Sequence, residues 1–105
     1  MRIYETIFIL DPSLSDDVFE GEIKKVTELI QSKNGNILKT DRWGKRKLTY
    51  PIDKKTEGYY VFLLYQSSSN LPKELESYFR LNESYIRYLT VVSQEKADVT
   101  EEEKA

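Results

Sequence analysis

Strand-like and helix-like stretches alternate along this chain in an order that few folds accommodate. Residues 2–10, RIYETIFIL, are rich in β-branched and aromatic side chains and end at an Asp-Pro pair, which indicates a strand followed by a turn. Residues 13–35 then change to helical spacing, with one apolar stripe. The side chains of that stripe are Phe19, Ile23, Val26 and Ile30. The first third of the chain therefore predicts a strand and an amphipathic helix.

The ends of this first helix are marked by local signals. Ser13 or Ser15 is placed to cap its first turn, and Asn34-Gly35 supplies a stop. Gly21 lies off the apolar stripe, and we expect it to cost up to about 1 kcal/mol relative to alanine. The helix is therefore predicted to start just after Ser13 or Ser15 and to stop at Asn34-Gly35.

The second half of the chain repeats the pattern with one additional strand. Residues 36–52 return to strand-like sequence, with a bulge or bend predicted at Gly44, and residues 53–58 predict a turn. Residues 58–66, GYYVFLLYQ, are the strongest strand signal, because apolar residues occupy both faces. Asn70 is placed to cap a second helix with Pro72 in its first turn. Its apolar face comprises Leu71, Leu75, Tyr78 and Phe79, and SYIRYLTVV is the last strand.

The resulting order is strand, helix, strand, strand, helix, strand. It is typical of an α+β, ferredoxin-like split βαβ fold, with a four-stranded antiparallel sheet and both helices on one face. We expect one domain of this fold over residues 1–94 and an acidic, disordered tail over residues 95–105. The other face of the sheet is left open, and the alternating strands place several large apolar or aromatic side chains on it. An exposed apolar patch of this kind indicates a binding partner.

The composition argues against an enzyme. The 105 residues include no cysteine and no histidine, so cysteine nucleophiles, histidine bases and the usual zinc ligands are missing. A small ferredoxin-like enzyme such as an acylphosphatase relative would need a phosphate loop, and no glycine-rich loop is present. We expect no cofactor and no small-molecule substrate. Without a long apolar run, the chain also predicts no membrane association and a cytoplasmic location.

Charge is concentrated in segments of opposite sign, although the net charge is only −2. Residues 39–55 hold seven cations and two acids, whereas residues 11–31 hold six acids and two lysines. Such polarity bears on partners rather than on the fold. The cationic segment contains WGKRKLTYPI, where three consecutive cations lie beside aromatic and apolar residues. It indicates either a surface for an anionic partner or lysines that protect a strand edge.

One reading of the open face is a stand-alone binder of single-stranded RNA. The RNA-recognition motif has the same element order and stacks bases on aromatic residues of its first and third strands. Residues 7–10, IFIL, and residues 57–62, EGYYVF, resemble its two short motifs loosely. Glu57 and Tyr60 depart from that pattern, which has a basic and a small residue there.

Residues 44–52, GKRKLTYPI, carry a more specific spacing. This spacing resembles the signature of the ribosomal protein S-six family, the sixth protein of the bacterial small ribosomal subunit. The matching positions are Gly44, Arg46, Lys47, Leu48, Tyr50 and Ile52. Thr49 stands where the family usually has alanine or serine. The resemblance extends to RIYETIFILDPSL, to Gly58-Tyr59-Tyr60 and to FRLNESYIRYLTV, so it covers nearly the whole chain.

The resemblance implies a structural role in the ribosome. Family members bind the central domain of small-subunit rRNA as a heterodimer with the eighteenth small-subunit protein, during assembly of the platform. By similarity, the residues expected to contact RNA are Arg2 and Arg87 first, then Arg80, Lys45, Arg46 and Lys47. Those expected to face the protein partner are Trp43, Tyr50, Tyr60 and Phe62.

Each of these assignments has a structural alternative. Arg87 would pair with Glu5 on the neighbouring strand, and the three cations Lys45 to Lys47 would protect a strand edge. Tyr50 and Ile52 would belong to the core. The sequence leaves these alternatives open.

Overall fold

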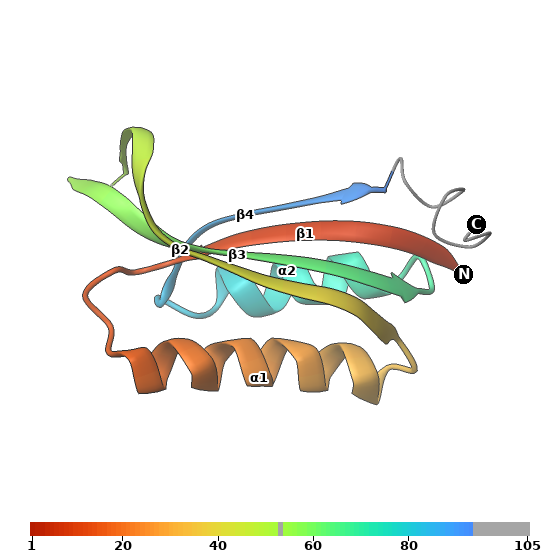
Figure 1. Ribbon diagram of the computed structural model, residues 1–105. Helices are drawn as coiled ribbons and strands as arrows, with labels where there is room; N and C mark the ends of the chain where they lie inside the picture. Colours follow the sequence, from red (N-terminus) through yellow and green to blue (C-terminus); the bar gives the residue numbers. More distant parts are fainter. Residues whose placement is uncertain (53, 94–105) are drawn as a thin grey trace.

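The predicted element order is confirmed in the computed structural model, which describes residues 1–52 and 54–93 (Figure 1). The elements are β1 (Arg2–Leu10), α1 (Asp16–Ser32), β2 (Asn36–Ile52), β3 (Lys55–Ser67), α2 (Leu71–Arg80) and β4 (Tyr85–Val92). The strands form one antiparallel sheet in the order β2-β3-β1-β4, and both helices cover the same face. The fold is therefore ferredoxin-like. The predicted acidic tail lies outside the described residues.

The helix α1 begins and ends with the expected capping signals. Ser15 occupies the N-cap, and its Oγ accepts a hydrogen bond from the Val18 amide at 3.4 Å. At the other end, Asn34 adopts the left-handed conformation (φ 66°), which asparagine tolerates better than most residues. The Gly35 amide then donates to the Ile30 carbonyl at 2.9 Å. The stop signal of the Asn-Gly pair is confirmed, and it is Asn34 that makes the left-handed turn.

The helix α2 begins after Asn70, as predicted, but the predicted capping hydrogen bond does not form. Asn70 occupies the N-cap of α2, but its side chain makes no capping hydrogen bond. Its backbone is already in the right-handed helical region (φ −82°, ψ −25°), whereas a capping residue usually has extended backbone. Burial of Leu71, Leu75 and Phe79 holds α2 on the sheet instead.

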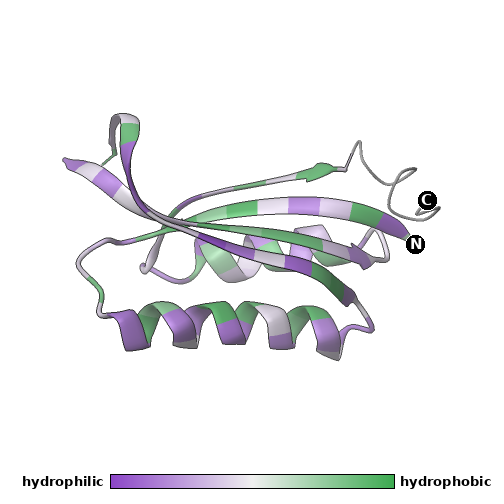
Figure 2. Cartoon of the chain, in the orientation of Figure 1, coloured by the Kyte–Doolittle hydropathy of each residue, from purple (hydrophilic) through white to green (hydrophobic). Residues whose placement is uncertain are grey.

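The core lies between the sheet and the helices. Alternate residues of β1 point into it, so Tyr4, Thr6, Phe8 and Leu10 are all buried. The predicted apolar stripes of α1 and α2 pack against these β1 side chains. Figure 2 shows hydrophobic and hydrophilic residues alternating along the helices and along the strands. A short polar chain crosses this core, where the Thr6 hydroxyl hydrogen-bonds the Tyr65 hydroxyl at 2.9 Å and the Thr90 hydroxyl at 2.8 Å.

None of the described helices is long and apolar enough to cross a membrane.

The hairpin of β2 and β3 continues beyond the other two strands. Strand β3 begins at Lys55, so the turn predicted over residues 53–58 is too long. Cross-strand pairing continues toward the tip, where Lys47 lies opposite Glu57 and Ile52 opposite Lys55. Residues 55–58 lie beyond the end of β1 pairing, and this part of the hairpin curls toward the face opposite the helices (Figure 1). We call residues 45–52 of β2 and 55–58 of β3 the arm.

Candidate nucleic-acid and partner interface

The open face of the sheet carries an apolar row that spans three strands. Phe62 of β3 lies opposite Ile7 of β1, and Ile7 lies opposite Leu89 of β4. Leu89 is 60% exposed, and Val91 two residues further along β4 is 45% exposed. Because the alternate residues of β1 are in the core, these side chains face away from the helices. This face therefore presents apolar surface to a partner.

Trp43 of β2 extends this row. Its ring is stacked on Phe62 with centroids 5.8 Å apart and an interplanar angle of 4°, and it also stacks on Tyr60 at 6.4 Å. Trp43 remains 37% exposed. Phe62 is thus covered on one side by a protein ring, and its neighbour in β1 is aliphatic. The pair of bare aromatic platforms that an RNA-recognition motif uses is not formed by these residues.

Several cations of the segment 39–55 are neutralised by neighbours. Lys39 pairs with Asp41 at 3.3 Å, and Lys55 pairs with Asp11 at 3.9 Å. The Arg42 guanidinium binds both carboxylate oxygens of Glu20 in α1, from Nε at 2.7 Å and from Nη2 at 2.9 Å. In the part of the chain that the structure describes, the cations of this segment without an ion pair are Lys45, Arg46, Lys47 and Lys54. The unneutralised charge is therefore concentrated at the arm and its turn.

The Arg42–Glu20 pair was not found from the sequence. Its hydrogen bonds hold the pKa of the Glu20 carboxyl below its ordinary value and raise the pKa of the Arg42 guanidinium. Glu20 is 22 residues away from Arg42 in the sequence, so only the packing of α1 beside β2 brings them together. No local pattern marks this contact.

The three consecutive cations of the arm do not point the same way. Lys45 lies opposite Tyr59 and Lys47 opposite Glu57, whereas Arg46 lies opposite Gly58. The Arg46 guanidinium carbon lies 5.1 Å from the centre of the Trp43 ring, so Arg46 shares the face of Trp43. Strand alternation then places Lys45 and Lys47 on the other face of the arm. All three are exposed.

Arg87 contacts Tyr50 of the arm and does not pair with Glu5. It lies opposite Ile9 of β1, and its Nη1 donates a hydrogen bond to the Tyr50 hydroxyl at 2.6 Å. The guanidinium carbon is 5.4 Å from the centre of the Tyr50 ring. The alternative pairing of Arg87 with Glu5 is wrong, because Glu5 lies opposite Val91 and accepts a hydrogen bond from Ser93.

The alternative that placed Tyr50 in the core is also wrong. Tyr50 is 54% exposed, and Ile52 is only half-buried. The arm curls toward the sheet face opposite the helices. Neither residue therefore reaches the core, which lies between the sheet and the helices.

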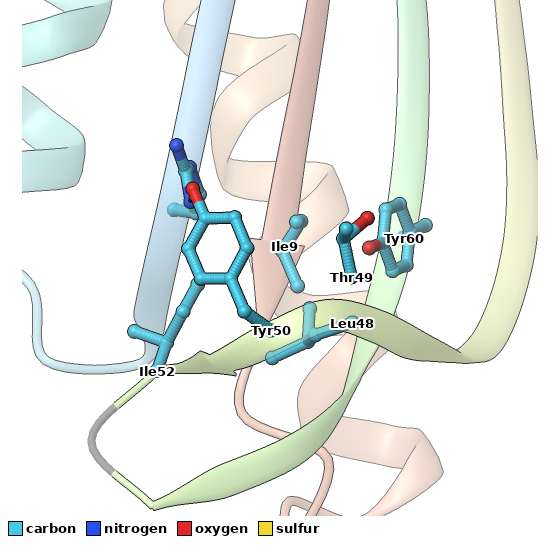
Figure 3. Close-up of a pocket in the computed structure, with 7 residues that line it drawn as sticks. Ile9, Leu48, Thr49, Tyr50, Ile52 and Tyr60 are labelled. Atoms are coloured by element: carbon cyan, nitrogen blue, oxygen red, sulfur yellow. Dashed lines mark hydrogen bonds between the residues drawn. The ribbon is translucent and has the colours of Figure 1, made fainter.

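A hollow of about 260 Å³ lies between the arm and the end of the sheet (Figure 3). Its lining residues are Ile9, Leu48, Thr49, Tyr50, Ile52, Tyr60 and Arg87. Figure 3 shows Leu48, Tyr50 and Ile52 arriving from the arm, with Ile9 of β1 beside the Tyr50 ring. Ile9 was not predicted as a site residue, because its strand pattern alone does not place it beneath the arm.

Arg2 and Arg80 lie away from this hollow. Arg2 lies opposite Ser67, at the end of β1 that is remote from Ile9 and therefore from Arg87. Seven residues of strand separate the two ends by roughly 23 Å. Arg80 ends α2 in the helix layer, where it pairs with Glu76 at 3.9 Å. The structure thus brings Arg87 against the arm at Tyr50, but places Arg2 and Arg80 elsewhere.

Comparison with known proteins is decisive for the family. The sequence model of ribosomal protein S6 matches residues 3–92. The chain belongs to the ribosomal protein S6 family. The small ribosomal subunit protein bS6 of Clostridium acetobutylicum is 46% identical over 96 residues, covering 91% of this chain and all of that protein. That of Caldanaerobacter subterraneus subsp. tengcongensis is 44% identical over 91 residues, covering 87% of this chain and 96% of that protein.

A solved structure shows the same architecture. The crystal structure of 30S ribosomal protein S6 from Thermotoga maritima matches with a TM-score of 0.87 and 30% identity, covering 94% of each chain. Members of the ribosomal protein S6 family are proteins of the bacterial small ribosomal subunit and not enzymes. The resemblance drawn from residues 44–52 is thereby confirmed, and so is the ribosomal location. Those residues form the β2 half of the arm and its base at Gly44.

Proposed function

We propose that this member of the ribosomal protein S6 family binds the central domain of small-subunit rRNA together with the eighteenth small-subunit protein, during assembly of the platform. The observation that carries the RNA part is the uneven neutralisation of charge. Lys39, Arg42 and Lys55 are paired with acids, while Lys45, Arg46 and Lys47 are exposed without an ion pair within the described residues. Cations without an ion pair can bind phosphate without first breaking one.

A protein partner is supported by the open face and by the net charge. The row of Phe62, Ile7 and Leu89 with Trp43 above it offers apolar surface that a second protein would bury. A net charge of −2 limits how tightly the chain alone can hold RNA, since affinity for phosphate grows with the number of neutralising cations. A basic partner would supply the remaining positive charge.

The individual residues are assigned from the resemblance to the family. Contact with RNA is assigned to Arg2, Arg80, Arg87, Lys45, Arg46 and Lys47. Contact with the partner is assigned to Trp43, Tyr50, Tyr60 and Phe62.

The proposal is tested by filter binding of a central-domain rRNA fragment, with and without the partner, over a series of salt concentrations. We expect weak binding by the chain alone and tight binding with the partner. The logarithm of the affinity should fall with the logarithm of salt concentration, with a slope of roughly −0.9 for each phosphate neutralised. Equal affinity with and without the partner would contradict the heterodimer.

Variants then locate the RNA contact. Lys45→Ala with Lys47→Ala should weaken the complex and lower the salt slope by roughly one unit for each phosphate that is no longer neutralised. Lys24→Ala with Lys73→Ala removes the same charge from exposed positions of α1 and α2 and serves as the matched control. An equal decrease in affinity for both pairs would mean that only net charge matters and would contradict an RNA contact at the arm.

A further inference from the structure

We infer that Arg87 is a positioning residue, which together with Tyr50 holds the arm over the open face and so presents its cations to RNA. This inference rests on the proposed function of the arm, and it reassigns Arg87 from RNA contact and Tyr50 from partner contact to positioning. It follows from where the two residues stand in the sheet. Tyr50 belongs to β2 and Arg87 to β4, which are the two edge strands of the order β2-β3-β1-β4.

Two edge strands of one sheet do not ordinarily touch. Adjacent strands lie about 4.8 Å apart, so β2 and β4 are separated by roughly 14 Å across β3 and β1. The contact forms because the arm curls over the end of the sheet (Figure 1). The 2.6 Å hydrogen bond from Arg87 to the Tyr50 hydroxyl therefore reports the curled position of the arm. If the arm were straight, Tyr50 would be out of reach.

The base of the arm contains two glycines that allow this curl. Gly44 has φ +82°, and the register of β2 against β3 shifts between Arg42 and Gly44. Gly58 packs so closely on the Ile9 side chain that a Cβ atom would collide with its methyl group. The arm thus leaves the sheet at a bend and approaches β1 at a point where no side chain fits.

Beyond these glycines the arm is a two-stranded ribbon. An isolated pair of strands is only marginally stable, so its direction depends on contacts with the rest of the molecule. The Arg87 guanidinium supplies two such contacts to one residue, a charge-assisted hydrogen bond and a position over the Tyr50 ring at 5.4 Å. Because its Nη1 is hydrogen-bonded to the Tyr50 hydroxyl and its guanidinium lies beside the Tyr50 ring, Arg87 is engaged by the arm.

Substitutions separate positioning from direct contact. Tyr50→Phe keeps the ring and removes the hydroxyl, Arg87→Ala removes the guanidinium, and Arg87→Lys keeps the charge but not the planar group. A direct phosphate contact would be unaffected by Tyr50→Phe, which leaves the guanidinium in place, and a contact made through charge alone would tolerate Arg87→Lys. The positioning role predicts that all three weaken RNA binding in the presence of the partner, by roughly tenfold for Arg87→Ala. The double variant Arg87→Ala with Tyr50→Phe should bind no more weakly than Arg87→Ala alone.

The position of the arm is measured in the same variants. The chain has no cysteine, so spin labels can be attached at Thr56→Cys in the arm and Glu28→Cys on α1, both exposed positions. We expect a narrow distribution of label distances in the parent and a broad one in Arg87→Ala and Tyr50→Phe. The thermal unfolding midpoint of each variant verifies that the body of the fold is intact.

Other outcomes would overturn the inference. If Arg87→Ala weakens RNA binding while the distance distribution stays narrow and Tyr50→Phe has no effect, Arg87 contacts RNA directly. The proposed function would then stand and the positioning role would fall. If the distribution broadens and RNA binding is unchanged, the arm does not need to be held for binding. If neither changes, the hydrogen bond between Arg87 and Tyr50 has no role in holding the arm.

Discussion

Glu22 of α1 accepts a hydrogen bond at 2.9 Å from the hydroxyl of Tyr85, the first residue of β4, although 63 residues separate them. Glu22 is only 7% exposed, and its carboxylate also accepts from the Tyr78 hydroxyl at 3.3 Å and from the Asn82 amide at 3.4 Å. A buried carboxylate is costly unless its oxygens are satisfied, so these donors belong together as one network. The network connects α1, the end of α2 and the strand that carries Arg87.

We expect Tyr85→Phe to destabilise the fold by about 1–3 kcal/mol, because Glu22 would lose its shortest hydrogen bond in a buried site. Urea unfolding measures this change. Tyr60→Phe is the matched control, since among the described residues the Tyr60 hydroxyl makes no hydrogen bond that the substitution would remove. Equal effects of the two substitutions would show that the Glu22 network contributes nothing specific.

Stability is expected to fall at alkaline pH. Burial, followed by the hydrogen bond to Glu22, raises the pKa of Tyr85 far above its ordinary value of 10.0. Below that ordinary value the hydroxyl is protonated in both the folded and unfolded chain. Above it the unfolded chain loses the proton first, so the free energy of unfolding decreases as pH rises. The urea midpoint between pH 8 and pH 11 should decline less steeply in Tyr85→Phe than in the parent.

Two glycines should respond in opposite ways to alanine. Gly44 has φ +82°, so Gly44→Ala introduces strain of about 1–2 kcal/mol and should destabilise the base of the arm. Gly21 lies in α1, and apart from its own stretch of helix nothing lies within 4 Å of a Cβ atom added there, so Gly21→Ala should stabilise by roughly 0.5–1 kcal/mol. Chemical denaturation of both variants checks the signs. A stabilising Gly44→Ala would contradict the left-handed bend.

Trp43 is expected to dominate binding of the protein partner. Its ring is stacked on Phe62 and is 37% exposed, so it projects a large rigid surface from the open face. Trp43→Ala should weaken the heterodimer by about 2 kcal/mol or more, a magnitude typical of interface tryptophans. Val18→Ala on α1 is the control, because Val18 is 39% exposed in the helix layer. Calorimetric titration with the partner gives both affinities, and similar decreases would argue against the open face.

The Glu20–Arg42 pair should contribute modestly and only above acidic pH. Its hydrogen bonds lower the pKa of Glu20 from 4.5, so its stabilisation is present at neutral pH and is lost as pH falls through the lowered value. Both side chains are about half exposed, so Glu20→Gln should cost about 0.5 kcal/mol at pH 7. The difference from the parent should vanish in acid, once the Glu20 carboxyl is protonated in the folded chain as well. A difference that persisted there would point to packing rather than charge.

The element order was predictable because the signals for it are local. The helical spacing of Phe19, Ile23, Val26 and Ile30 and the apolar run at residues 58–66 act over a few residues each. The turn predicted over residues 53–58 was too long, because cross-strand pairing with β2 makes residues 55–58 part of β3. Similarly, Asn70 occupies the cap position without capping α2, since the burial of Leu71 and its neighbours is sufficient.

By itself, the sequence determined the fold class and the family, through periodicity in the elements and residue spacing at Gly44 to Ile52. Only the tertiary structure decided which face of each strand is open, which cations remain unpaired, and that Arg87 meets Tyr50 rather than Glu5. Strand alternation has a period of two whichever side is buried, so the choice of side depends on packing against the helices. The Arg87–Tyr50 contact joins opposite edges of the sheet, and such a contact exists only once the arm has curled.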